Sequence, residues 1–181
     1  MPTSEPERPN ILLVTADQWR FDYLGSAGAD FVNTPNLDRL AGRGVRFTNC
    51  ISNCPVCAPA RIGLASGRHP WKIGSLGNDS FLPLGMTTYY SRLRDHGYRV
   101  GCCGKLDLAK PDHFNGQHGD RPCVYSWGFT HPEEVEGKVH SLGWPEPMGP
   151  YGFWLQEQGL YEDYYEERHK LDGETCWYTP S

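Results

Sequence analysis

Segments with the pattern of a strand alternate with segments of helical pattern along the first 110 residues. The run over residues 10–16 is continuously apolar and contains β-branched side chains, which is typical of a strand buried in a parallel sheet. Residues 45–51 and 98–103 are predicted to form two further strands. Because parallel strands need crossover connections, this alternation predicts an α/β fold with an open, mostly parallel sheet flanked by helices.

Three helices are predicted from the residues at which they start and stop. Proline is well tolerated in the first helical turn, and glycine commonly ends a helix in the left-handed conformation. Threonine caps a helix start with its hydroxyl group. The signals that we interpret in this way are Thr34 and Pro35 with Gly42 or Gly44, Pro59 to about Ser66 with Gly67, and Thr87 or Thr88 with Gly97.

The pattern changes after Pro111, where Gly, Pro, Trp and His replace regular periodicity. Four of the six tryptophans lie between Trp127 and Trp177. The acidic and aromatic stretch over residues 161–170 is predicted to be an exposed helix. Residues 111–181 are therefore interpreted as a loop-rich, aromatic continuation of the domain that residues 1–110 begin.

Composition and charge argue against several classes of partner. The formal net charge is -5, and no cluster of Lys and Arg is interleaved with aromatic residues, so nucleic acid is not expected as a partner. The apolar run at residues 11–14 is too short for a signal sequence or a membrane span, so we expect no membrane partner and a cytoplasmic protein. Seven cysteines, an odd number, without an export signal indicate reduced thiols.

Three groups of chemical interest each follow a predicted strand, namely Asp17, the loop that contains Cys57, and Lys105. In open α/β sheets, ligands bind beyond the carboxyl ends of the strands. We therefore expect these three groups to converge at one edge of the sheet.

The densest motif runs from Cys57 to Arg61, with the sequence Cys-Ala-Pro-Ala-Arg, and is followed by Ser66, Gly67 and Arg68. It resembles the CxPxR signature of the sulfatases, a family of the alkaline phosphatase superfamily. The resemblance implies that a formylglycine-generating enzyme oxidises Cys57 to formylglycine, whose hydrated aldehyde attacks the sulfur of a small-molecule sulfate ester. A helix amino terminus at this point supplies N–H donors and the positive end of the helix dipole, and Arg61 adds a fixed cation.

Asp17 and Gln18 resemble the acidic pair that binds a divalent cation after the first strand of sulfatases. The resemblance implies a metal site formed by Asp17, Gln18 and the modified Cys57. Hard oxygen ligands favour calcium, which we expect first, and also magnesium or manganese, over zinc. The glutamine departs from the pattern in the way that phosphonate monoester and phosphodiester hydrolases of the superfamily do, so a phosphate or phosphonate ester is an alternative substrate.

Gly104 and Lys105 resemble the GK motif of the family, whose lysine contacts the sulfate oxygens. Two residues later, where most sulfatases carry a histidine, this chain has Asp107, a candidate for the base that triggers release of the bound sulfate. Asn78, in a turn rich in Gly, Asn and Asp, is a candidate donor to the substrate.

The resemblance covers residues 9–110 in family order, and it implies that residues 1–110 are the amino-terminal half of a sulfatase catalytic domain. The family's remaining metal ligands and a second lysine come from a later part of the chain, and nothing in this sequence matches them. We therefore expect a fragment or a truncated product that by itself turns over sulfate or phosphate esters negligibly.

Three alternatives stay open at this point. Cys54 and Cys57 form a CxxC motif between a predicted strand and a predicted helix, which is typical of thiol redox sites. Together with Cys50 they form CxxxCxxC, the spacing with which radical SAM enzymes hold an iron–sulfur cluster. The third alternative is a binding module without catalysis, in which Cys57 stays unmodified.

Overall fold

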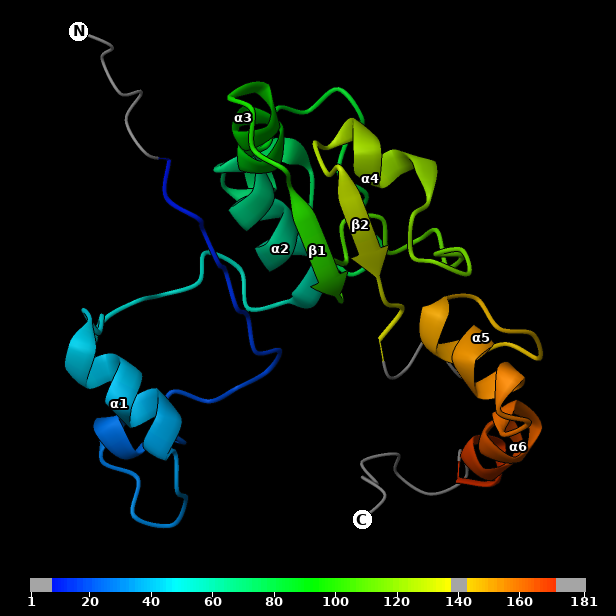
Figure 1. The fold of residues 1–181 in the computed structure, drawn as a ribbon, viewed down its shortest axis with the longest axis horizontal. Coiled ribbons are helices and arrows are strands. Elements are labelled where there is room, and N and C mark those ends of the chain that lie inside the picture. Colours follow the sequence, from blue (N-terminus) through cyan, green and yellow to red (C-terminus); the bar gives the residue numbers. More distant parts are fainter. Residues whose placement is uncertain (1–7, 138–142, 172–181) are drawn as a thin grey trace, which may run out of the picture. The chain divides into compact units, whose positions relative to one another are not determined.

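The computed structural model describes residues 8–137 and 143–171 of the chain (Figure 1). The chain divides into two compact units, Met1–Ile51 and Ser52–Ser181. The expected division at residue 110 stays a prediction, and that position lies inside the second unit.

In the first unit, the helix α1 (Pro35–Arg43) starts and ends where the sequence predicts. Thr34 precedes it as the capping position, a proline stands in its first turn, and Gly44 follows its last turn. The Asp38 carboxylate of α1 accepts a backbone N–H from the short 3-10 helix η1 (Gly25–Ala27) at 2.7 Å. This bond joins α1 to η1 and gives a partner to the N–H of Ser26, one of the N–H groups that the start of a helix leaves unpaired.

The strands predicted over residues 10–16 and 45–51 are not formed, so both predictions are wrong. The apolar side chains of residues 11–14 are between 54% and 87% exposed. A strand is held by N–H and C=O bonds to a neighbouring strand. Within the described residues of the first unit, no strand pairs with either segment. An apolar pattern shows that a segment suits a sheet, but it does not supply the neighbouring strand.

The second unit contains a sheet and the helices beside it. Figure 1 shows α2 and α3 next to β1, and α4 next to β2. In the described part of the chain, no helix is long and apolar enough to cross a bilayer. The elements of the unit in chain order are α2 (Cys57–Ser66), η2 (Pro70–Ile73), α3 (Tyr89–Asp95), β1 (Gly101–Gly104), α4 (Pro122–Ser126), β2 (His131–Glu134), α5 (Pro150–Glu157) and α6 (Tyr161–Leu171).

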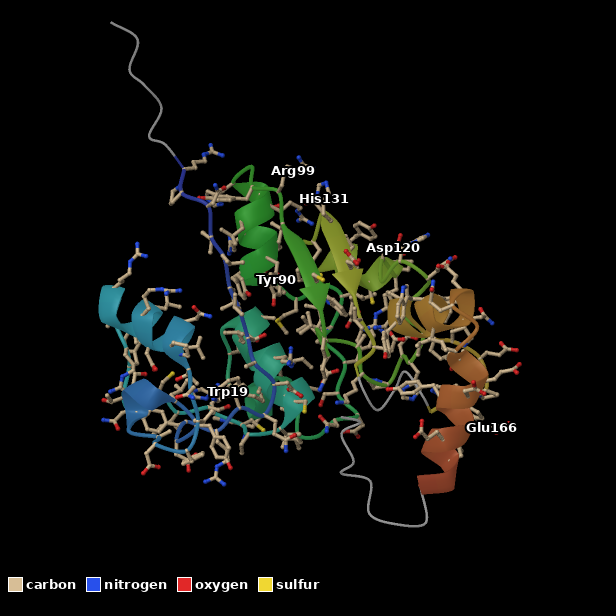
Figure 2. All side chains as sticks on the ribbon, turned by 60° about the horizontal axis from the view of Figure 1, so that its bottom comes forward. Trp19, Tyr90, Arg99, Asp120, His131 and Glu166 are labelled. Atoms are coloured by element: carbon tan, nitrogen blue, oxygen red, sulfur yellow. The ribbon has the colours of Figure 1, made fainter. Side chains whose placement is uncertain are left out.

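The strands β1 and β2 pair in parallel, with Gly101 opposite His131 and Gly104 opposite Glu134. The α/β class, with a parallel sheet flanked by helices, is therefore confirmed, and β1 lies where a strand is predicted. The sequence does not predict β2, because His-Pro-Glu-Glu has no apolar pattern. At the amino-terminal ends of the two strands, Arg99 Nη2 lies 2.8 Å from His131 Nε2 (Figure 2). The site residues described below lie at the opposite, carboxyl ends.

The core of the second unit surrounds the indole of Trp127, which is fully buried. Its Nε1–H donates to the backbone carbonyl of Leu82 at 3.2 Å. Thr88 caps α3 as predicted, because its Oγ1 accepts the N–H of Ser91 at 3.0 Å and donates to the carbonyl of Trp127. From α2, the side chain of Ile62 is fully buried in the same cluster. These contacts hold α2 and α3 against the sheet.

The helices α5 and α6 form the last described part of the unit. The buried carboxylate of Glu136 accepts the N–H of Gly152 at 2.8 Å and that of Tyr151 at 3.4 Å, so it caps the start of α5. The helix α6 confirms the prediction for residues 161–170, and its described side chains are mostly exposed apart from Tyr161.

Candidate active site

Cys57 is the first residue of α2, where a helix leaves its N–H groups unpaired. Val56 before it is extended, Pro59 in the first turn has no N–H, and Gly67 ends the helix in the left-handed conformation. The helix predicted from Pro59 is thus confirmed, and it begins two residues earlier. The Cys57 thiol is free and partly exposed, so it lies at the positive end of the helix dipole and is reachable from solvent.

The side chain of Asn78 pairs with the first turn of α2. Its Oδ1 accepts the N–H of Ala58 at 3.1 Å. With the amide oxygen engaged in this bond, the NH2 group is the part of Asn78 that can donate to a ligand. Asn78 is therefore next to the turn that contains Cys57, and its contact with a substrate stays a prediction.

Arg61 connects α2 to the carboxyl end of β1. Its Nη1 donates to the backbone carbonyl of Lys105 at 2.5 Å. Lys105 directly follows β1, as predicted. Its aliphatic chain packs on Gly137, where an added Cβ would lie 3.3 Å from Lys105 Cδ. The helix that begins with Cys57 and the lysine of the GK motif are therefore brought together.

Asp107 is buried, with 6% of its side chain exposed, and it binds two lysines. Its Oδ2 lies 3.2 Å from Nζ of Lys105 and 2.9 Å from Nζ of Lys110. The backbone of Asp107 has a φ of 54°, a left-handed conformation that Asp, Asn and His adopt more readily than other side chains. Sequence reasoning missed Lys110, although its position three residues after Asp107 was a usable signal.

A second buried ion pair, which the sequence also did not reveal, anchors the loop after β1. Arg121 Nη2 lies 2.6 Å from Oε2 of Glu134, and Arg121 Nη1 donates to the carbonyl of Asp112 at 2.6 Å. Burial raises the pKa of the Glu134 carboxyl, and the charge of Arg121 opposes that shift. The pair links β2 to the loop that contains Asp107 and Lys110.

A small polar pocket lies at the carboxyl ends of β1 and β2. This is the edge at which ligands bind in open α/β sheets. Its mixture of acidic and basic side chains includes both members of the buried pair and the Asp107 carboxylate. The lining residues are Asp107, Ala109, Lys110, Asp112, His113, Asn115, Arg121, Glu134 and Glu136.

Asp17 and Gln18 belong to the first unit, and Cys57 and Lys105 belong to the second. Asp17 and Gln18 form a turn after the extended segment, both are exposed, and Gln18 has a φ of 58°. A carboxylate and an amide oxygen are hard ligands, so their chemistry fits calcium, magnesium or manganese. Within residues 8–137 and 143–171, no three His, Cys, Asp or Glu side chains are grouped to hold a metal.

The cysteines of the alternative motifs are free thiols, with Cys50 in the first unit and Cys54 and Cys57 in the second. Burial raises the pKa of the Cys102 thiol to about 11. Burial therefore favours the neutral thiol of Cys102 over the thiolate, the form that acts as a nucleophile.

Comparison with known proteins gives one consistent family. The sulfatase family model matches residues 9–135. An ulvan-active sulfatase of Formosa agariphila is 41% identical over 104 residues, which cover 58% of this chain and 20% of the relative. Arylsulfatase D of Homo sapiens is 31% identical over 167 residues, 78% of this chain and 28% of the relative. A choline-sulfatase of Rhizobium meliloti is 35% identical over 144 residues, 75% of this chain and 28% of the relative.

A solved sulfatase structure from Bacteroides thetaiotaomicron, described with the metabolism of multiple glycosaminoglycans, is also similar. It has a TM-score of 0.56 and 32% identity, and the match covers 65% of this chain and 26% of that one. The chain thus spans between 20% and 28% of the length of these three relatives. Its fold is an incomplete alkaline phosphatase-like fold. With the family model matching more than half of its residues, this chain belongs to the sulfatase family.

Proposed function

We propose that this chain provides the nucleophile and the anion-binding residues of a sulfuric ester hydrolase, which cleaves small-molecule sulfate esters through a formylglycine derived from Cys57. One observation carries the proposal: Cys57 begins α2, and Arg61, one turn further on, is bonded to the backbone of Lys105. The sulfatase relatives support hydrolysis of sulfuric esters as the class of reaction.

Sulfuryl transfer depends mainly on positioned cations around a tetrahedral centre. Arg61 and Lys105 supply two positive charges from a helix and from a strand end that are joined by a hydrogen bond. The amino terminus of α2 adds the positive end of its dipole beside Cys57. These groups bind and orient the anion whichever leaving group it carries.

The formylglycine supplies chemistry that a serine lacks, because its hydrate offers one hydroxyl for attack and a second whose deprotonation lets the sulfate leave. Asp17 and Gln18, with modified residue 57, would hold the divalent cation, for which calcium is our first expectation. That cation would polarise the sulfate oxygens as a Lewis acid. A formylglycine-generating enzyme is then a required partner of the chain.

Mass spectrometry of the peptide that contains Cys57 tests the proposal, after coexpression of the chain with a formylglycine-generating enzyme. Conversion exchanges one sulfur for oxygen and removes two hydrogens, a loss of about 18 Da. The same tryptic peptide contains Cys54, so Cys54→Ala is a matched control that should still show the loss. A loss that persists in Cys57→Ala, or no loss in the unmutated chain, would overturn the proposal.

A second candidate function is hydrolysis of phosphonate monoesters or phosphodiesters at the same site. The observation that favours it is Gln18, a neutral side chain where an acidic ligand is usual in the family. Parallel assays of an aryl sulfate and an aryl phosphodiester on the complete modified enzyme separate the two substrates. The thiol redox and iron–sulfur alternatives are not favoured, because the relatives found are sulfatases.

A further inference from the structure

We infer that Lys110 is a further cation of the anion site, beside Arg61 and Lys105, and that Asp107 is a positioning residue which holds Lys105 and Lys110 side by side. The inference rests on the proposed function, because it concerns the site in which Lys105 binds the sulfate group. It gives Asp107 a different role from that of the base suggested by its place in the motif.

The position of one carboxylate oxygen of Asp107 supports its role in positioning the two lysines. Oδ2 of Asp107 contacts Nζ of Lys105 at 3.2 Å and Nζ of Lys110 at 2.9 Å, so the two ammonium groups are neighbours. Their side chains are 24% and 13% exposed, which leaves both partly accessible to a ligand. A tetrahedral anion presents several oxygen acceptors, and it can therefore accept hydrogen bonds from two adjacent ammonium groups.

The charges of the group favour an anion. Two ammonium groups this close repel each other, and the shared carboxylate offsets that repulsion. The three side chains together still have one net positive charge. The guanidinium of Arg61, bonded to the backbone of Lys105, adds a second. These positive charges favour binding of a sulfate group, although the site contains a buried carboxylate.

The chain around Asp107 is held rigidly enough to position both lysines. The next two residues, Leu108 and Ala109, are 1% and 0% exposed. The N–H of Leu82 donates to the carbonyl of Leu108 at 2.7 Å. Arg121 also donates to the carbonyl of Ala109 at 3.3 Å, so two hydrogen bonds hold the backbone directly after Asp107. A carboxylate anchored in this way can preorganise its partners.

Lysine side-chain NMR of the 181-residue chain tests the inference with inorganic sulfate as the probe. The chain has five lysines, so the ¹³Cε and Nζ signals are few enough to assign with single Lys→Met variants. Sulfate is added at constant ionic strength against sodium chloride. We expect the signals of Lys105 and Lys110 to shift together with one Kd, and that of Lys72, which lies over the Trp71 ring, to stay in place.

Three variants separate positioning from a purely structural role. We expect Lys110→Met to weaken sulfate binding several-fold, as loss of a charged hydrogen bond to the anion does. We expect Asp107→Asn to weaken sulfate binding as well, although it removes a negative charge, because the two ammonium groups lose the carboxylate oxygen that they share. Lys72→Met should bind as the unmutated chain does. Asn tolerates the left-handed backbone at position 107, and the Nε1–H signal of Trp127 reports that each variant is folded.

Each outcome decides the matter. A shift at Lys105 without one at Lys110, or unchanged sulfate affinity in folded Asp107→Asn and Lys110→Met, overturns the inference and leaves the proposed function standing. If neither lysine responds to sulfate, the inference is overturned, while the mass measurement at Cys57 decides the proposed function separately.

Discussion

Arg61 donates a hydrogen bond to the backbone carbonyl of Lys105, 44 residues further along the chain. The bond joins the first half of α2 to the end of β1. We expect Arg61→Ala to lower the free energy of unfolding by about 1.5–3 kcal/mol, the usual contribution of a hydrogen bond to a charged group. Urea unfolding measures this change in the free energy of unfolding.

The control variant is Arg68→Ala, which removes an exposed arginine just after the same helix. It should change the free energy of unfolding by less than about 0.5 kcal/mol. Equal urea midpoints for the two variants would contradict the role of this bond.

The Glu134 carboxyl makes stability depend on pH in a defined direction. Burial raises its pKa above 4.5 in the folded state, so the folded chain binds the proton more tightly than the unfolded chain does. The contribution of Glu134 to stability is therefore lost as pH rises from 4.5 through the raised pKa. We expect the free energy of unfolding of Glu134→Gln, relative to the unmutated chain, to rise over this range.

Chemical unfolding at several pH values between about 4.5 and 7 measures this difference. Glu133→Gln is the control, because Glu133 is the neighbouring residue of β2 and is exposed. A difference that stays constant with pH for Glu134→Gln, or one that is equally large for Glu133→Gln, would show that the folded state does not raise this pKa.

Gly128 allows a close approach of two chain segments. An added Cβ would lie 2.3 Å from the backbone N of Ser91, and φ is 111°. Gly159 also has a positive φ, 70°, but nothing lies within 4 Å of its added Cβ. We expect Gly159→Ala to lower the free energy of unfolding by about 1–2 kcal/mol, from backbone strain alone. Gly128→Ala should lower it by a further amount of about 1–3 kcal/mol, because the added Cβ clashes with the backbone of Ser91. Thermal unfolding of the two variants measures both changes. Equal losses of stability in the two variants would show that the clash at Gly128 adds nothing to the backbone strain.

The isolated chain is expected to hydrolyse p-nitrophenyl sulfate no faster than buffer does, even when Cys57 is modified. The physical reason is that the resemblance to sulfatases implies further metal ligands and a second lysine that nothing in this sequence matches, and this chain spans 20% to 28% of the relatives described above. A spectrophotometric assay with calcium present checks the rate. Turnover that Cys57→Ala abolishes would contradict the expectation.

Features that depend on neighbours in sequence were predictable. The starts of α1 and α3 follow from a proline and a threonine cap, and α1, α2 and α3 end close to a glycine, each signal acting within one helical turn. The start of α2 lies two residues before the predicted proline. The order of Cys57, Arg61 and Lys105 also sufficed to indicate the family that the comparisons show. The prediction of a strand just before Lys105 was also right, because β1 ends at Gly104.

The sequence by itself determined the helices α1, α2, α3 and α6, the strand β1 and the sulfatase family, because helix caps and short motifs act over a few residues. The tertiary structure decided that a polar segment pairs as β2 while residues 10–16 and 45–51 form no strand. It also decided that Asp107 holds Lys105 and Lys110, and that Arg121 meets Glu134. A strand needs a second strand to pair with, and a buried charge needs an opposite charge, and the folded chain brings these partners together from distant parts of the sequence. No local pattern of side chains specifies which distant residue becomes the partner.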